Sequence, residues 1–247
     1  MSHNRIAFVT GGTGGIGTAI CQRLHQESFR VVAGCSLHSE RKRDWMAAQH
    51  EAGFDFHICE LDVANWENTQ QAIAELREQI GPIDVLINNA GITRDASFRK
   101  LTPENWQAVL DTNLNSLFNT TKQIIGDMLD KGWGRIINIS SVNGQRGQFG
   151  QTNYSAAKAG IHGFTMALAR EVSGKGITVN TISPGYISTA MTDAMRPEVL
   201  EQITATIPVG RLGQPAEVAS LVAWLASEES AYATGADFSL NGGMNMQ

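Results

Sequence analysis

The sequence predicts an α/β fold in one domain, a doubly wound parallel sheet of about seven strands with helices on both faces. Short apolar segments alternate with longer helical segments along the 247 residues, which is the pattern of successive βαβ units. The strand centres, such as Ile-Ala-Phe-Val and Ile-Ile-Asn-Ile, are mostly apolar, as expected for strands covered on both faces. No linker or break in composition divides residues 1–247, so we expect a single domain.

The expected elements follow one another in the order that this fold requires. Strands are predicted at 6–10, 31–34, 54–60, 85–88, 136–139, 179–182 and 238–240. Helices are predicted at 16–27, 40–51, 66–79, 103–130, 153–173 and 214–226. The long helix at 103–130 has the clearest start, because Thr102 is a good N-cap and Pro103 suits the first helical position.

The segment 186–213 departs from the alternation. It places Pro197, Pro208, Gly210 and Gly213 around one short helical piece. A long excursion inside a compact domain is usually a functional loop, so we predict a substrate lid within this segment.

Composition argues against several classes of function. No segment approaches the ~18 to 20 apolar residues of a membrane span. Because the first residues lead directly into a predicted strand, we expect no signal peptide. A net charge of −5 without a basic block argues against nucleic acid or an anionic membrane as a partner. Cys21, Cys35 and Cys59 lack metal-ligand spacing and suit buried, reduced thiols in the cytoplasm. The six histidines form no cluster, so no metal is assigned and most are expected on the surface.

A glycine-rich segment, Thr10-Gly-Gly-Thr-Gly-Gly-Ile-Gly17, lies between the first strand and the first helix. Glycines there let the backbone turn tightly and approach a phosphate, and the helix N-terminus offers free N–H groups and partial positive charge. An ordinary glycine-rich turn is the alternative. The strand–loop–helix context in the first βαβ unit favours a nucleotide site, and with it a Rossmann-type sheet.

Tyr154 and Lys158 lie four residues apart, on one face of a predicted helix. A phenol has a pKa of about 10, and a neighbouring ammonium group lowers that pKa by stabilising the phenolate. The pair is therefore interpreted as a tuned proton donor. Ser141 lies thirteen residues before the tyrosine, and this separation selects it over Ser140 as the partner at the reacting centre.

Four motifs occur in a fixed order along the chain: Gly11-x-x-x-Gly15-x-Gly17, Asn88-Asn89-Ala90-Gly91, Ser141, and Tyr154-x-x-x-Lys158. With these motifs the sequence resembles the short-chain dehydrogenase/reductase family over essentially its whole length. The resemblance implies a catalytic tetrad of Asn113, Ser141, Tyr154 and Lys158. Tyr154 would be the general acid, Ser141 would orient the substrate oxygen, Lys158 would hold the nicotinamide ribose, and Asn113 would position a water. Asn113 alternatively bridges a kink in the long helix.

The same resemblance implies a nicotinamide cofactor and its contacts. These are Gly11, Thr13, Gly14, Gly15, Ile16, Gly17, Ser36, Arg41, Leu61, Asp62, Val63, Asn89, Ala90, Gly91, Ile92, Tyr154, Lys158, Pro184, Gly185, Ile187 and Thr189. Asp62 is alternatively a turn or cap residue.

The choice between NAD and NADP is readable at the end of the second strand. No acid stands at 35 or 36, whereas Ser36, Arg41 and Lys42 offer groups that bind a 2′-phosphate. NADPH/NADP⁺ is therefore predicted. The sequence departs from NADP-dependent relatives in having Gly14 where an arginine is frequent, which leaves Arg41 as the main phosphate ligand or, alternatively, as a solvated helix charge.

Within the family, the segment 143–153 and the chain's end resemble the reductases of acetoacetyl-CoA, which make (R)-3-hydroxybutyryl-CoA for polyhydroxybutyrate. The implied substrate contacts are Asp95, Lys100, Ser141, Gln148, Phe149, Gln151, Tyr154, Gly185 and Tyr186. Lys100 would attract the CoA phosphates, unless it is a plain surface charge. A polar surface loop remains the alternative for 143–153.

Three other functions stay open at this point. Reductases of 3-oxoacyl-[acyl carrier protein] share the fold, tetrad and chemistry, but segment 130–134 is poor in the positive charge that an acidic carrier protein would need. A sugar or secondary-alcohol dehydrogenase and a non-catalytic NADP(H) sensor are more remote. The family resemblance further implies a homotetramer, with helices 103–130 and 153–173 at one interface and the C-terminal strand at another.

Overall fold

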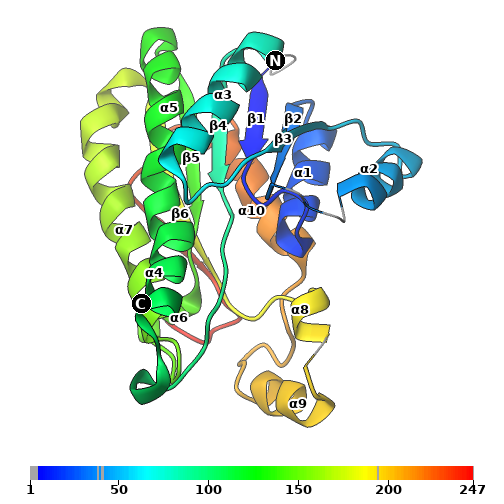
Figure 1. Ribbon diagram of the computed structural model, residues 1–247, viewed down its shortest axis with the longest axis vertical. Coiled ribbons are helices and arrows are strands. Elements are labelled where there is room, and N and C mark those ends of the chain that lie inside the picture. The colour runs from blue at the N-terminus through cyan, green and yellow to red at the C-terminus, as the bar shows by residue number, and fades with distance from the viewer. Residues whose placement is uncertain (1–4, 38, 40–41, 194, 247) are drawn as a thin grey trace.

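The computed structural model describes residues 5–37, 39, 42–193 and 195–246. Seven parallel strands form one sheet in the order β3-β2-β1-β4-β5-β6-β7 (Figure 1). The strands are β1 (Ile6–Val9), β2 (Arg30–Cys35), β3 (His57–Glu60), β4 (Val85–Asn88), β5 (Gly134–Ile139), β6 (Ile177–Pro184) and β7 (Asp237–Leu240). The predicted doubly wound, Rossmann-type parallel sheet is confirmed.

Strand order changes direction between β1 and β4. The chain first adds β2 and β3 on one side of β1, and then adds β4 to β7 on the other side. In parallel sheets a crevice opens outside the carboxyl ends of the strands where the order reverses, and ligands bind there. Topology alone therefore locates a site next to the glycine-rich segment.

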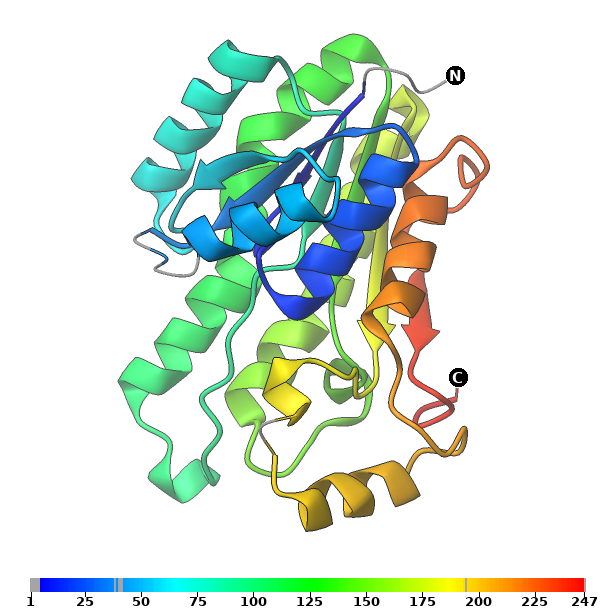
Figure 2. The same cartoon turned by 90° about the vertical axis from the view of Figure 1, so that its right-hand side faces the viewer.

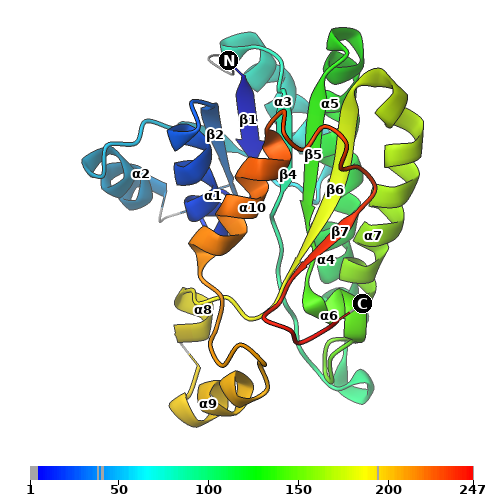
Figure 3. The same cartoon turned by 180° about the vertical axis from the view of Figure 1, so that it is seen from behind.

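Helices cover both faces of the sheet. On one face lie α3 (Trp66–Ile80), α5 (Ser116–Lys131) and α7 (Thr152–Val172); on the other lie α1 (Gly15–Gln26) and α10 (Pro215–Ala226) (Figures 1 and 3). Alternate strand residues serve the two layers. Ala7 and Val9 join the core under α1 and α10, whereas Ile6 and Phe8 join the opposite core. The sheet is thus buried on both faces, as the apolar strands predicted.

The helix predicted at 103–130 is not continuous. It consists of α4 (Pro103–Leu110), one π-helical turn η2 (Asp111–Asn115) and α5. Its predicted start is correct, because the Thr102 side chain accepts a hydrogen bond from Asn105 N at 3.3 Å. A π turn inserts an extra residue per turn and frequently marks a functional site, and here it contains Asn113.

Segment 186–213 and the strand predicted at 54–60 also differ from the sequence prediction. Segment 186–213 holds two short helices rather than one, α8 (Ala190–Asp193) and α9 (Pro197–Ala205), which lie beyond the carboxyl ends of the strands (Figure 2). The strand predicted at 54–60 begins only at His57, because Phe54 N donates to Gln49 O and closes the preceding helix instead.

The short helix α6 (Val142–Arg146) and the 3₁₀ turns η1 (Phe98–Lys100) and η3 (Ser173–Lys175) were not predicted. The remaining helix, α2 (Lys42–Glu51), lies beyond the β2–β3 edge (Figure 1). Within the described part of the chain, no helix combines the length and the apolar character needed to cross a bilayer.

Candidate active site

A cavity of about 790 Å³ opens at the carboxyl ends of the strands, beside the point where the strand order reverses. It extends from the glycine-rich segment past the end of β2 to the start of α7. The predicted cofactor residues that line it are Gly11, Thr13, Gly14, Gly15, Ile16, Gly17, Ser36, Leu61, Asp62, Val63, Asn89, Ala90, Gly91, Ile92, Tyr154, Lys158, Pro184, Gly185 and Thr189. One cavity therefore joins nearly the whole predicted set, together with Ser141.

The first turn of α1 presents free backbone N–H groups to this cavity. The N-cap residue, Gly14, has no side chain that could accept a hydrogen bond from these N–H groups. All residues of α1 are described, and none in its first turn is acidic. Uncapped N–H groups and the helix dipole favour an anion at this end. A side chain on Gly17 would place its Cβ 2.1 Å from Gly11 O, so only glycine permits this close turn. The residues present thus fit a dinucleotide's phosphates.

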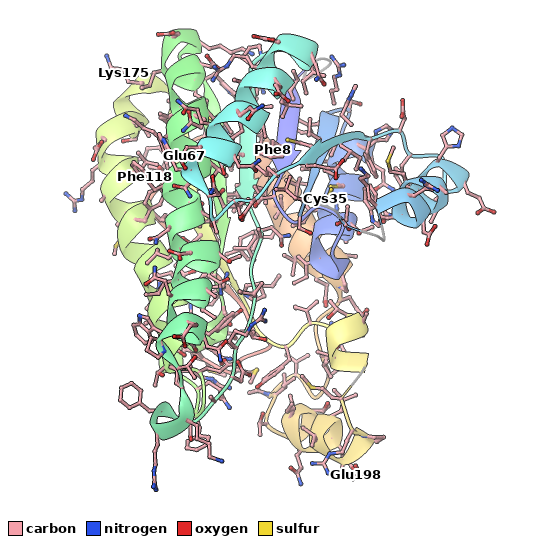
Figure 4. The ribbon with its side chains drawn as sticks, in the orientation of Figure 1. Phe8, Cys35, Glu67, Phe118, Lys175 and Glu198 are labelled. Carbon is pink, nitrogen blue, oxygen red and sulfur yellow. The ribbon has the colours of Figure 1, made fainter. Side chains whose placement is uncertain are left out.

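The end of β2 lines the cavity through Cys35, Ser36 and Leu37 (Cys35 is labelled in Figure 4), and none of the three is acidic. Arg41, predicted as the main phosphate ligand, lies outside the described residues. Lys42 forms an ion pair with Glu60, so its ammonium group is already engaged in this structure. Asp62 accepts a hydrogen bond from Ala64 N at 3.0 Å, which means that it shapes its own turn while lining the cavity.

Two asparagines hold the loop after β4. Asn89 donates to Thr10 O and Gly11 O at 3.0 and 3.1 Å, which ties this loop to the glycine-rich segment. Fully buried Asn113 bonds both backbone groups of Ile92, accepting from N at 2.8 Å and donating to O at 2.9 Å. The π turn directs Asn113 across the fold, so its contact is with another segment rather than with a kink of its own helix.

The three remaining tetrad candidates meet where β5 ends and α7 begins. Ser141 is the N-cap of α6, and its Oγ accepts from Asn143 N at 3.1 Å. Lys158 is buried and donates from Nζ to Ile139 O at 2.8 Å, with Nζ 5.6 Å from the centre of the Tyr154 ring. The four-residue spacing on α7 thus places both side chains at the same end of the cavity.

Burial sets the ionisation of this pair. Burial raises the pKa of Tyr154, a hydrogen bond with Ser141 lowers it, and the charge of Asp95 raises it. Burial lowers the pKa of Lys158 to about 8. The net direction for the tyrosine is opposite to the predicted lowering, because loss of water outweighs the stabilisation of the phenolate. At pH 7 the phenol is protonated and the lysine is still charged.

The predicted substrate residues are more widely spread than the cofactor residues, and several of them are exposed. Gln151 donates to Asp95 at 2.8 Å and accepts from Asn143 at 2.9 Å. Gln148, Phe149 and Lys100 are exposed, and Phe149 retains 89% of its accessible surface. The part of this segment around Gln148 and Phe149 is therefore an open surface, and Gln151 ties it to Asp95 and Asn143.

Tyr186 and Ile187 lie beside the main cavity rather than in its lining. Tyr186 lines an adjoining cavity of about 210 Å³, which Gly185 shares with it. Ile187 is buried in the core and forms a parallel bridge with Gly213. The positions of both residues follow from the path of the chain, which turns toward α8 and α9 after β6.

One functional neighbour was missed by sequence reasoning. His162, one of six histidines of which most were expected on the surface, is mostly buried and contacts Ser140, Ser183 and Asp237. A signal for it exists, because His162 follows Tyr154 and Lys158 at the same four-residue spacing.

The family model described as short chain dehydrogenase matches residues 5–200. The chain belongs to the short-chain dehydrogenase/reductase family. Members of this family are oxidoreductases with a nicotinamide cofactor, which agrees with the uncapped α1 terminus and the cavity. The resemblance drawn from four motifs is therefore confirmed.

Curated relatives within the short-chain dehydrogenase/reductase family match nearly end to end. The chain is 65% identical to an acetoacetyl-CoA reductase of Cupriavidus necator, over 98% of both chains. It is 54% identical to an acetoacetyl-CoA reductase of Allochromatium vinosum, over 98% of this chain and 99% of the relative. A 3-oxoacyl-[acyl-carrier-protein] reductase of Vibrio cholerae is 42% identical over 98% of both chains.

Proposed function

We propose that this protein is a cytoplasmic, NADPH-dependent reductase that converts acetoacetyl-CoA to (R)-3-hydroxybutyryl-CoA for polyhydroxybutyrate synthesis. The observation that carries the substrate is the 65% identity, over 98% of both chains, to an acetoacetyl-CoA reductase. The carrier-protein reductase is less similar, at 42% over the same share. The open loop around Gln148 and Phe149 supports a substrate that approaches from solvent.

The chain's own residues would hold NADPH along the cavity. The α1 N-terminus and the glycine-rich segment bind the pyrophosphate, Asp62 and Val63 bind the adenine, and Lys158 binds the nicotinamide ribose. Ser36 and Arg41 bind the 2′-phosphate, which the absence of a carboxylate at 35–37 also favours. When bound, the cofactor supplies the hydride that reduces the 3-oxo carbon. The backbone at Ile187 and the hydroxyl group of Thr189 would lie near its carboxamide.

The reacting carbonyl needs a proton as negative charge develops on its oxygen. Tyr154 donates this proton from its phenol, and Ser141 donates a hydrogen bond to the same oxygen. The raised pKa of Tyr154 keeps that proton available at neutral pH. Lys158 then stabilises the phenolate by its charge, and Asn113 positions the water through which the site regains a proton. Turnover in the direction of reduction should fall above about pH 8, where Lys158 loses its charge.

Substrate contacts and assembly complete the proposal. Asp95, Gln151 and Tyr186 border the acyl and pantetheine arm, while Lys100 attracts the CoA phosphates. The segment 186–213, with α8 and α9, acts as the lid. We further propose one catalytic domain per chain and four chains per enzyme.

The deciding experiment compares acetoacetyl-CoA with acetoacetyl-[acyl carrier protein], each with NADPH and with NADH, by following loss of reduced cofactor. Fast turnover of the CoA thioester with NADPH is expected. Strong preference for the carrier-protein substrate would move the enzyme to fatty-acid synthesis with its mechanism intact, and turnover with NADH alone would refute the cofactor assignment. If neither thioester reacts, the substrate proposal fails, and simple secondary alcohols are the next substrates to test.

A further inference from the structure

A polar network adjoins the reacting centre and includes Ser140, which lines the main cavity beside Lys158. It joins the ends of β5 and β6, helices α6 and α7, and the start of β7. Its central member is His162, whose Nε2 lies 3.0 Å from Ser140 Oγ, 3.3 Å from Ser183 Oγ and 3.4 Å from an oxygen of Asp237. Asp237, from β7, supplies the charged group that faces the imidazole.

The direction of these hydrogen bonds can be deduced by counting protons. Ser140 Oγ donates its proton to Lys158 O at 2.8 Å, and Ser183 Oγ donates its proton to Asp237 at 2.7 Å. A hydroxyl group has only one proton to donate. Both oxygens can therefore only accept from His162, so Nε2 carries a proton in the neutral as well as in the charged imidazole. The bonds run from His162 to Ser140, and from Ser140 to the backbone of Lys158.

This chain of bonds holds Lys158 from its backbone side. Nζ of Lys158 donates to Ile139 O at 2.8 Å, while Lys158 O accepts from Ser140, the residue directly after β5. Ile139 and Ser140 therefore bind both the ammonium group and the backbone carbonyl of Lys158. Helix α6 packs tightly against the same turn, because a Cβ on Gly144 would lie 2.8 Å from the Lys158 carbonyl carbon.

The network is anchored to the last part of the chain. Gln145 of α6 donates to Asp237 at 2.8 Å and to Ser239 at 2.7 Å. Asn245 donates to the side-chain oxygen of Gln145 at 3.2 Å, where the chain after β7 returns toward α6 (Figure 3). Because Ser141 is the N-cap of α6, the same anchor holds the helix that begins at the candidate catalytic serine.

We propose that His162 is a positioning residue for the reaction: through Ser140 and Asp237 it fixes the turn of α7 that carries Lys158 against the segment between β5 and α6 that carries Ser141. This inference rests on the proposed roles of Lys158, Ser141 and Tyr154. His162 does not line the cavity itself, and it acts through Ser140, which does. Small displacements of a reacting group cost rate steeply, and about 100-fold for 1 Å is a reasonable scale.

Three variants separate positioning from folding. His162→Leu removes the donor while keeping an apolar group of similar size. His162→Gln restores an N–H donor at similar reach. Thr165→Val is the matched control, because buried Thr165, on the same helix, bonds Asn138 at 2.9 Å and Thr181 at 2.7 Å without contacting Ser140. Thermal stability, kcat, KM for each substrate and the pH profile are measured for all three.

His162→Leu is expected to lower kcat about 10- to 100-fold with little change in KM for NADPH. A loosened turn admits water to Lys158, so the fall in rate above pH 8 should move to higher pH in this variant only. His162→Gln should recover most of kcat with the wild-type profile, and Thr165→Val should lose stability but keep kcat. The proposal is overturned if His162→Leu keeps the wild-type kcat and the wild-type pH profile. It is also overturned if, across all three variants, kcat falls only in proportion to the loss of thermal stability.

A second readout does not depend on turnover and separates this inference from the proposed function. Acetylation of Lys158 by acetic anhydride is followed by peptide mass spectrometry as a function of pH, in wild type and in His162→Leu. Reaction beginning at higher pH in the variant supports the proposal even if no thioester is reduced. Identical titrations of Lys158 in the two proteins would overturn it.

Discussion

Lys158 carries a positive charge inside the protein, and that charge lowers the stability of the fold. Burial lowers its pKa to about 8, against 10.5 for a free lysine, so the folded protein holds this proton less tightly than the unfolded chain. The penalty is complete below pH 8 and disappears as the pH rises to 10.5. A stability cost of this kind is common where a side chain is placed for chemistry rather than for packing.

Replacing Lys158 by methionine should therefore stabilise the cofactor-free protein at pH 7. The shift corresponds to about 3 kcal/mol, and losing the bond to Ile139 O returns about 1 kcal/mol, for a net gain of about 2 kcal/mol. Urea unfolding of wild type and variant at pH 7 and pH 10 measures this difference in the free energy of unfolding. The gain in stability should be smaller at pH 10 than at pH 7, and the variant should be inactive at both. Equal gains in stability at the two pH values would show that Lys158 carries no destabilising charge.

Tyr154→Phe tests the proton donor. Without the phenol, kcat for acetoacetyl-CoA reduction should fall by about 10² to 10⁴-fold, the usual contribution of a general acid. NADPH affinity, measured by fluorescence titration, should stay near the wild-type value because the ring still fills its place beside Lys158. Near wild-type turnover would exclude Tyr154 as the acid.

The sequence spacing of Tyr154 and Lys158 correctly predicted that their side chains lie together. Tyr154 and Lys158 lie together because a helix repeats every 3.6 residues, and the structure places them at one end of the cavity. The direction of the tyrosine pKa could not be read in the same way. It depends on how much water the surrounding fold excludes, and no local pattern encodes that.

At the scale of elements, the turn from β1 into α1 is the most constrained. Gly17 faces Gly11 O so closely that any side chain would displace the loop. The glycines were predicted for phosphate approach, and Gly17 shows that a glycine can also be required by contact within the loop itself.

Gly17→Ala should weaken NADPH binding strongly and destabilise the protein by about 1–3 kcal/mol, the usual cost of an overpacked site. Isothermal titration and thermal unfolding measure the two effects. Gly174→Ala is the control, because no atom lies within 4 Å of its added Cβ and it is distant in sequence from the loop. Unchanged NADPH affinity in Gly17→Ala would show that the loop does not carry the phosphates.

The π turn of η2 shows what element prediction from sequence misses. Residues 103–130 have a helical pattern throughout, and the start at Thr102 was predicted correctly. The extra residue at Asp111–Asn115 is stabilised by Asn113 binding Ile92, a segment 21 residues away. A long-range contact therefore selects a backbone form that the local sequence does not require.

The surface of the whole molecule retains large apolar side chains on two of the helices predicted to meet other subunits. Phe118 of α5 is 54% exposed and stacks on Trp66 of α3 with ring centres 5.5 Å apart, and Met166 of α7 is 52% exposed. Phe118 and Glu67 lie on the same side of the molecule (Figure 4). Exposed aromatic residues of this kind favour the interface proposed for the tetramer.

Phe118→Lys should convert the tetramer to smaller species, because a charge replaces an apolar anchor where the subunits would meet. Light scattering coupled to size exclusion measures the mass, with Met46→Lys on α2 as a control for a similar change outside the proposed interfaces. A wild-type mass of one chain, or a tetramer unaffected by Phe118→Lys, would refute this assembly.

The sequence by itself determined the α/β class, the parallel sheet and the glycine-rich turn, and it singled out the serine, tyrosine and lysine that the structure brings to one cavity. Each of these follows from short periods or fixed spacings, which a chain encodes locally. The tertiary structure decided the strand order, the partner of Asn113, the burial that sets two pKa values and the network around His162. These depend on contacts between distant residues, such as Gln145 with Asp237 across 92 positions, and only the packed fold brings such residues together.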